Sequence, residues 1–288
     1  MAFDPFLYVA FIAGFVAGRL TRWRSPWVER ATIGSVVVLL GLLGSSLHSV
    51  APALLLNAVP VSLLFLGLIM GATLAVVSLL PHGVATGDRG DRAGGSRGRI
   101  VLVFAAALVL GYAGLGPLGL PASSWIEYVL YLLLALVAFD LQLHRADFAR
   151  FWVPLGAALV GSTVAAGVMV ALSVLPASAA FATAFGFGWY TLSGPLVAAR
   201  LGPALGLVAF LTNFLRESTT MLSAPWLGSR LGGAGIAAAG GATSMDTTLY
   251  FANRFGERGA GGLALSTGLA LTVLASAALP VILGLGGA

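Results

Sequence analysis

The sequence contains no cysteine and no lysine, and it carries little charge of either sign. Without cysteine the chain can form no disulfide, no thiolate metal site and no cysteine nucleophile. Charged residues make up only 9% of the chain, whereas soluble domains carry about a quarter. Because 59% of its 288 residues are hydrophobic, the sequence excludes a soluble globular domain and predicts a protein that crosses a membrane several times.

The basic balance of the chain has a simple topological explanation. All 15 Lys and Arg residues are arginines, and most lie in short segments between apolar runs, so we expect no nucleic-acid partner behind the net charge of +5. The 39 glycines favour helices that pack closely in lipid. No basic segment precedes the first apolar run, so we expect an uncleaved first span rather than a signal peptide.

Apolar runs of about 20 residues, the length that crosses a bilayer, recur along the whole chain. We predict an all-α polytopic membrane protein with about ten transmembrane segments; eight full spans plus two re-entrant or broken elements is a close alternative. The predicted spans lie at about 5–20, 31–47, 53–80, 100–120, 125–143, 152–174, 179–199, 203–226, 231–250 and 260–286.

Arginine placement predicts the orientation. If the spans alternate, nearly all loop arginines fall on one side, which the positive-inside rule makes cytoplasmic, so both termini are expected outside. The long polar segment 81–99 is rich in glycine and predicts a flexible cytoplasmic linker within the first half. The arginines on this side are Arg19, Arg22, Arg24, Arg30, Arg89, Arg92, Arg97, Arg99, Arg145, Arg150, Arg200, Arg254 and Arg258.

The two halves of the chain have related patterns. Five predicted spans precede residue 150 and five follow it with the opposite orientation, which predicts inverted repeats over 1–150 and 151–288, the second carrying the main site. Each half has a span interrupted by Gly or Pro, at 111–121 and at 232–244. Matched interruptions are typical of discontinuous helices that cross at a midplane binding site, so we expect these two segments to be partners.

Polar residues enter the most apolar part of the chain between Phe185 and Asp246. Glu217 and Asp246 lie well inside predicted spans, where a charge costs at least ~3 kcal/mol and must face a cavity, a partner or a proton. Asn213 is one helical turn before Glu217 and shares its face, whereas Arg216 points about 100° away. We interpret Glu217 and Asp246 as a functional site.

Hydroxyl and aromatic side chains accompany these acids. A break at Gly240-Gly241 would free backbone groups to line a cavity, and hydroxyls follow it at Thr243, Ser244, Thr247 and Thr248. Two interpretations of the neighbouring Trp189 and Tyr190 stay open: they stack over an ammonium group, or they are interfacial aromatics.

Enzyme chemistry finds little support in the sequence. Ser193 has no histidine in the core spans to activate it, and the three histidines are too dispersed for a metal cluster. The Gly-rich segments lack the lysine and the strand–helix context of nucleotide loops. As two acids, Glu217 and Asp246 also leave open an intramembrane aspartyl hydrolase.

Three segments resemble the hallmark segments of the prokaryotic lysine exporter family LysO. They are Gly-Phe-Gly-Trp-Tyr-Thr-Leu-Ser-Gly at 186–194, Arg216-Glu217 preceded by Asn213, and Gly-Ala-Thr-Ser-Met-Asp-Thr-Thr at 241–248. The resemblance implies a cytoplasmic-membrane exporter of L-lysine and toxic analogues such as thialysine, built from inverted repeats with crossed, broken helices. It also implies an important intramembrane acidic pair, which falls on Glu217 and Asp246. The N-terminal half matches only in hydropathy and loop placement.

The resemblance and the acids together give an expected mechanism. Lysine carries a net charge of +1, so an inside-negative potential opposes its exit by ~2.3 kcal/mol per 100 mV. We expect H⁺ to drive export by alternating with the substrate at one site, with no cofactor and no bound metal. The expected site comprises Glu217, Asp246, Asn213, Thr243, Ser244, Trp189, Tyr190, Ser193 and Arg216.

Two other classes of function remain open. A Na⁺-coupled carrier of an organic anion would use Thr243, Ser244, Asn213 and Asp246 as cation ligands, because hard cations prefer oxygen. A structural or receptor-like membrane protein would need none of these groups for transport.

Overall fold

In the computed structural model of the chain, the regular secondary structure of the described residues is helical. These are residues 5–21, 26–48, 52–80, 102–103, 106–107, 109–118, 122–140 and 150–285, and no strand occurs among them. The all-α prediction is therefore confirmed. Three described helices are long and apolar enough to cross a membrane: Leu56–Leu79, Trp152–Ala171 and Ala260–Gly284. The full number of spans and the repeats stay predictions, and the predicted linker 81–99 lies outside the described residues.

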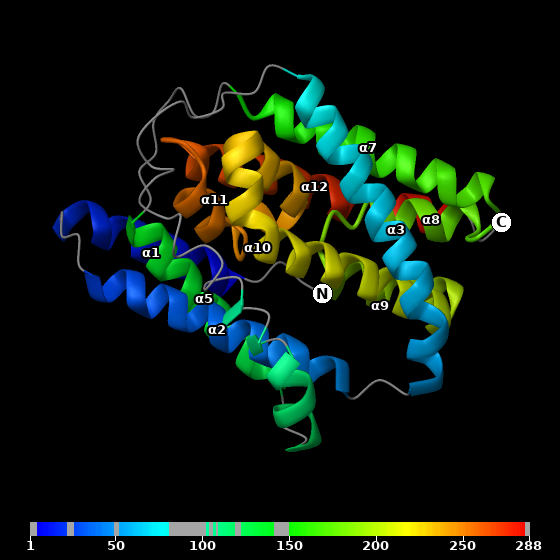
Figure 1. Ribbon diagram of the computed structural model, residues 1–288, viewed down its shortest axis with the longest axis horizontal. Coiled ribbons are helices and arrows are strands. Elements are labelled where there is room, and N and C mark those ends of the chain that lie inside the picture. The colour runs from blue at the N-terminus through cyan, green and yellow to red at the C-terminus, as the bar shows by residue number, and fades with distance from the viewer. Residues whose placement is uncertain are drawn as a thin grey trace. The chain divides into compact units, whose positions relative to one another are not determined.

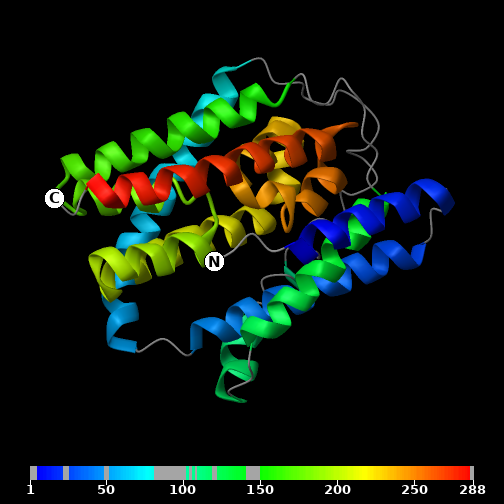
Figure 2. The ribbon, with the colours of Figure 1, turned by 180° about the vertical axis from the view of Figure 1, so that it is seen from behind.

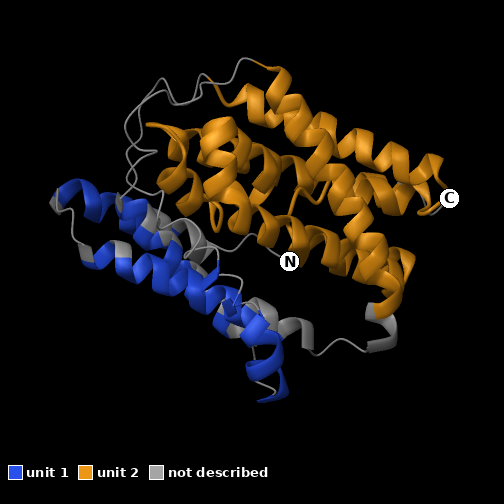
Figure 3. Ribbon diagram, viewed as in Figure 1, with its two compact units in different colours: residues 1–51, 87–143 blue, residues 52–86, 144–288 orange. Residues whose placement is uncertain are grey.

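The helices form two compact units, which Figure 3 shows in different colours. Unit 1 comprises Met1–Ala51 and Gly87–Leu143, and unit 2 comprises Pro52–Thr86 and His144–Ala288. Unit 2 contains both predicted acidic residues and therefore the whole candidate site. The division of the chain into repeats at residue 150 stays a prediction.

In unit 1, α5 (Ala122–Asp140) packs against α1 (Pro5–Thr21) and α2 (Pro26–His48). Gly14 and Gly18 of α1 approach α5 so closely that an added Cβ would collide with its backbone. Small residues thus set this contact, as expected for helices in lipid. The segment predicted to be interrupted departs from α-helical geometry, with a π-helical turn η2 (Gly111–Leu115) and a 3₁₀ turn η3 (Gly116–Leu118) beside α2.

In unit 2, α3 packs against α7 and α10, and α12 packs against η4 and α10 (Figures 1 and 2). This arrangement encloses the segment around η4, where the chain leaves α-helical geometry. The elements are α3 (Pro52–Leu79), α7 (Trp152–Ala171), α8 (Ala177–Ala184), α9 (Tyr190–Leu201), α10 (Pro203–Gly240), η4 (Gly241–Met245), α11 (Leu249–Phe255) and α12 (Ala260–Leu285).

The long α10 consists of two helices joined at Gly232. This residue has φ 63° and ψ −162°, a conformation that glycine adopts without steric cost, and it separates residues 203–231 from a half-helix at 233–240. The Glu257 carboxylate accepts the N–H of Gly233 over 2.7 Å and so satisfies the first freed donor of the half-helix. Glu257 lies between two predicted spans, and the pattern of the sequence around it does not indicate this capping contact.

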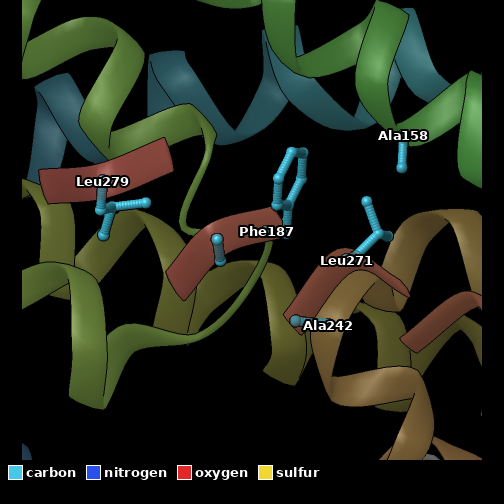
Figure 4. Packing of buried hydrophobic residues seen from close by; sticks show 6 residues of the cluster. Ala158, Phe187, Ala242, Leu271 and Leu279 are labelled. Carbon is cyan, nitrogen blue, oxygen red and sulfur yellow. The ribbon is translucent and has the colours of Figure 1, made fainter. Parts of the chain in front are cut away.

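A second break separates α8 from α9 within one predicted span. Residues 185–189 are not α-helical, and Phe187 has φ 47°, a conformation that side chains rarely adopt. The Phe187 carbonyl accepts the N–H of Ala242 over 2.8 Å, so this break meets the one after α10. Figure 4 shows the Phe187 ring among Ala158, Leu271 and neighbouring apolar side chains.

Unit 2 therefore contains two discontinuous helices that cross at their breaks. The sequence predicted the break after Gly240 and expected its partner at 111–121. The observed contact of this break is with 185–189, a segment that the sequence marked for its polar and glycine residues but not as a break. The expected pairing with 111–121 stays a prediction.

The α3–α7 contact generates a test of the packing. Gly161 of α7 lies against Thr73 of α3, and an added Cβ would collide with the Thr73 backbone, whereas the space around Gly167 on the same helix is open. Overpacking of this kind costs about 1–3 kcal/mol, while alanine gains about 0.5–1 kcal/mol over glycine in an open helix. Gly161→Ala should lower the thermal unfolding temperature in detergent, and Gly167→Ala should leave it unchanged or raise it. Equal stability of the two variants would contradict the packing described.

Candidate functional site

Arg216 satisfies backbone carbonyls that the break after α10 sets free. The last carbonyls of a helix have no partner within it, and water is absent at membrane depth. The fully buried Arg216 donates from Nε to the Ala239 carbonyl over 2.8 Å and from Nη2 to the Ala238 carbonyl over 3.0 Å. Its Nη1 lies 3.4 Å from the Ser162 hydroxyl of α7. The predicted site residue Arg216 is thus a helix cap in this structure.

Two predicted hydroxyls complete this cap. Ser244 donates to the Ala237 carbonyl over 2.8 Å, and Thr243 donates to the Gly240 carbonyl over 3.0 Å. Thr243 also lies 3.1 Å from the hydroxyl of Thr248. Each of the last four carbonyls of the half-helix therefore has a side-chain donor, and both hydroxyls are engaged in holding the break.

Asn213 organises the other break. Its Oδ1 accepts the N–H of Gly188 over 2.7 Å, and its Nδ2 lies 2.9 Å from the Thr183 carbonyl and 3.0 Å from the Ser193 hydroxyl. The structure brings Asn213 and Ser193 together, as the sequence grouped them, but at the junction of α8 and α9. Although Asn213 precedes Glu217 by one turn, its amide is directed at this junction.

The two predicted acids meet at a single threonine. Glu217 comes from the first part of α10, and Asp246 directly follows η4. The Thr247 hydroxyl is hydrogen-bonded to Glu217 Oε1 and lies 3.2 Å from Asp246 Oδ1. The backbone N–H of Thr247 also donates to Asp246 Oδ1 over 2.6 Å. The structure therefore joins residues from two separate segments into one acidic pair.

One oxygen of this pair is left without a partner. Glu217 is 2% exposed, and its Oε2 has no hydrogen-bond partner among the residues that the structure describes. A buried carboxylate oxygen that lacks a partner is costly. The neighbouring Arg216 does not compensate it, because its guanidinium is directed at Ala238 and Ala239. The site is therefore suited to a proton or a cationic ligand.

The structure separates the roles of the two predicted aromatic residues. The Tyr190 ring stands edge-on to Phe210 and Phe214, with centroids 5.2 and 5.7 Å away, and its hydroxyl is close enough to interact electrostatically with both acids. Trp189 packs against the apolar cluster around Phe187. Tyr190 thus lies at the acidic pair, and Trp189 supports the crossing.

Sequence reasoning noted Thr247 only as one of several nearby hydroxyls, and it missed Ser162 altogether. The signal for Thr247 was its place beside Asp246, whereas Ser162 lies on another helix with no marking pattern around it. Within the described parts of the chain, no three His, Cys, Asp or Glu side chains gather where they could hold a metal ion.

The chain has helices that can span a membrane, and two discontinuous helices cross beside its buried acidic pair. Many secondary transporters build their binding sites in this way. The family model for the lysine exporter LysO matches residues 101–283, more than half of the chain. The chain belongs to this family, which is one of transporters rather than enzymes.

Two curated relatives support this assignment. Lysine exporter LysO of Escherichia coli (strain K12) is 34% identical over 165 residues, which cover 54% of each chain. The "Putative lysine exporter" of Haemophilus influenzae (strain ATCC 51907 / DSM 11121 / KW20 / Rd) is 26% identical over 170 residues, 54% of this chain and 87% of the relative. The matched part thus spans about half the length of the E. coli relative, and no solved structure matches the chain.

The role of Arg216 leads to a stability prediction. Arg216→Met would leave the Ala238 and Ala239 carbonyls buried without donors, at about 1–3 kcal/mol each, so this variant should unfold at a clearly lower temperature in detergent. Arg216→Lys should be intermediate, because a lysine lacks the planar fork of donors. Arg230→Met, an exposed position on the same helix, is the matched control. If Arg216→Met is as stable as this control, the guanidinium does not hold the break.

Proposed function

We propose that the chain is a secondary transporter that exports L-lysine, or a related cationic amino acid, in exchange for protons at Glu217 and Asp246. The observation that carries this proposal is the Oε2 of Glu217, which has no hydrogen-bond partner among the described residues and is buried beside a second carboxyl group where two broken helices cross. Family membership supports the substrate class, because the family and the E. coli relative are both named for lysine export.

The charges around the pair favour a cationic substrate. Glu217 and Asp246 together can carry two negative charges, and Arg216, the charged residue adjacent to Glu217, has its donors engaged elsewhere. An ammonium group would supply the missing donors to Glu217 Oε2.

Proton exchange follows from the chemistry of a carboxyl group. The same oxygen atoms can hold a proton or a cation but not both, so the two ligands exclude each other. A proton that enters down the electrical potential recovers the ~2.3 kcal/mol per 100 mV that a departing cation requires. The same site would accept toxic lysine analogues such as thialysine, which share the ammonium group.

The membrane arrangement belongs to the same proposal. The described helices follow the predicted apolar runs in order, with α8–α9 as one broken span and residues 233–255 as another. We infer about ten segments in the cytoplasmic membrane with both termini outside, as the arginine distribution favours.

The structure gives less support to a Na⁺-coupled carrier of an organic anion. The amide oxygen of Asn213, one of its expected cation ligands, already accepts the N–H of Gly188. The hydroxyls of Thr243 and Ser244, two further expected ligands, donate to backbone carbonyls and so hold the break after α10.

Flux measurements in proteoliposomes test the proposal. Glu217→Gln and Asp246→Asn should each reduce lysine export driven by a pH gradient by about 10- to 100-fold, the effect of losing one hydrogen bond to a charged group. Glu257→Gln is the matched control, because glutamine keeps an oxygen that can accept the Gly233 N–H.

The outcomes separate the candidate functions. Export at the parental rate in both Glu217→Gln and Asp246→Asn would refute proton exchange at this pair. Sodium-dependent uptake of an organic anion, without lysine efflux, would establish the alternative carrier.

A further inference from the structure

We propose that the Thr247 hydroxyl is the bridge through which Glu217 and Asp246 share a single proton, so that each transport cycle moves one proton. This inference rests on the proposed proton exchange and adds to it a residue and a stoichiometry. It is carried by the position of one hydroxyl between two carboxyl groups.

The hydrogen-bonding capacity of a hydroxyl limits what this position can hold. Thr247 Oγ1 has one proton to donate and lone pairs to accept with. If both carboxyl groups were ionised, only one could receive that proton, and the other would face an oxygen lone pair. Both contacts are satisfied when one carboxyl group is protonated and donates to Thr247, which donates to the other. The arrangement therefore fits one shared proton.

The backbone contact of Thr247 indicates which of the two acids accepts the hydrogen bond from its hydroxyl. Asp246 Oδ1 already receives the N–H of Thr247 over 2.6 Å, which suits an ionised oxygen that accepts from both the amide and the hydroxyl. Glu217 is 2% exposed and Asp246 is less completely buried. Protonated Glu217 would then donate through Oε1 to the hydroxyl.

Transfer along this bridge is balanced. The O–H bond of Glu217 breaks as Thr247 Oγ1 takes its proton, and the original Thr247 O–H bond breaks as Asp246 Oδ1 takes that one. One proton passes from the buried acid to the less buried acid, and Thr247 is unchanged. The Oε2 of Glu217, unpartnered among the described residues, is then available to a cationic substrate.

Few other charged or titratable groups face the pair. Tyr190 lies beside it from α9, and Arg216 is engaged with the half-helix carbonyls. From α11, Tyr250 is buried with its ring against Phe251, and Arg254 is exposed. The helix α12, which packs against η4, contains no charged residue. Thr247 is thus the bridging group between the two carboxyls in the described part of the chain.

Two substitutions separate the hydroxyl from the shape of the side chain. Thr247→Val removes the hydroxyl and keeps the volume, and Thr247→Ser keeps the hydroxyl. Thr267→Val is the control, because Thr267 is also buried but donates to the Leu263 carbonyl of its own helix. In proteoliposomes, labelled lysine and a pH-sensitive dye give the ratio of protons to lysine, and exchange of lysine for lysine reports substrate movement without net proton transfer.

We expect one proton per lysine in the parental chain, in Thr247→Ser and in Thr267→Val. In Thr247→Val, export driven by the pH gradient should fall about tenfold or more, while lysine–lysine exchange persists. If Thr247→Val does not elute as a folded protein, Thr247→Ala takes its place in the same measurements.

Four results would overturn the inference. Unchanged coupling in Thr247→Val, or a ratio of two protons in the parental chain, would refute the bridge while leaving proton-driven export standing. Loss of lysine–lysine exchange in both Thr247→Val and Thr247→Ser would show that the residue is required for substrate movement rather than for proton transfer. Lysine export without any proton movement in the parental chain would refute the proposed exchange and the bridge with it.

Discussion

The candidate site depends on one constraint: a helix that breaks within a membrane must find donors for its last carbonyls inside the protein. Arg216 meets much of this need by donating to Ala238 and Ala239. Adjacent residues of a helix point about 100° apart. Once Arg216 is fixed toward the half-helix, the direction of Glu217 is fixed as well, and Glu217 meets Thr247. The contact that closes the break thus also places the acid.

The half-helix at 233–240 is too short to be stable alone, since isolated helices of fewer than about 12 residues are marginal even in water. It is held at both ends by groups whose charge suits the helix dipole. The carboxylate of Glu257 lies at its N-terminus, and the guanidinium of Arg216 lies at its C-terminus. The positive φ of Phe187 at the crossing is a conformation that costs of order 1–3 kcal/mol, and Asn213 and the surrounding apolar cluster hold it in place.

Much of this site was predictable because a polar or charged residue is costly in lipid, so its presence within an apolar span indicates a role. Glu217 and Asp246 stood out in their apolar runs, and Gly240-Gly241 indicated a break. The contact of that break with 185–189 was not predictable, because the hydrogen bond between Phe187 and Ala242 joins segments far apart in sequence. The residue types do not show in which direction each side chain points. Asn213, Thr243 and Ser244 were therefore grouped with the acids, although they form hydrogen bonds to backbone groups at the breaks. Glu257 resembled a loop acid because its partner is a backbone N–H 24 positions away.

A buried arginine next to a buried glutamate would ordinarily be expected to neutralise it, and that pairing would defeat cation binding. A substrate ammonium would then have to displace a guanidinium attached to the same helix, at high effective concentration. The break after α10 prevents this, because Ala238, Ala239 and Ser162 engage the donors of Arg216 on another face. A lysine side chain at position 216 could not fully replace the arginine, since a single ammonium group lacks the planar fork that reaches two adjacent carbonyls. The broken helix and the available acid are therefore parts of one arrangement: the carbonyls that the break frees are what keep the internal cation away from Glu217.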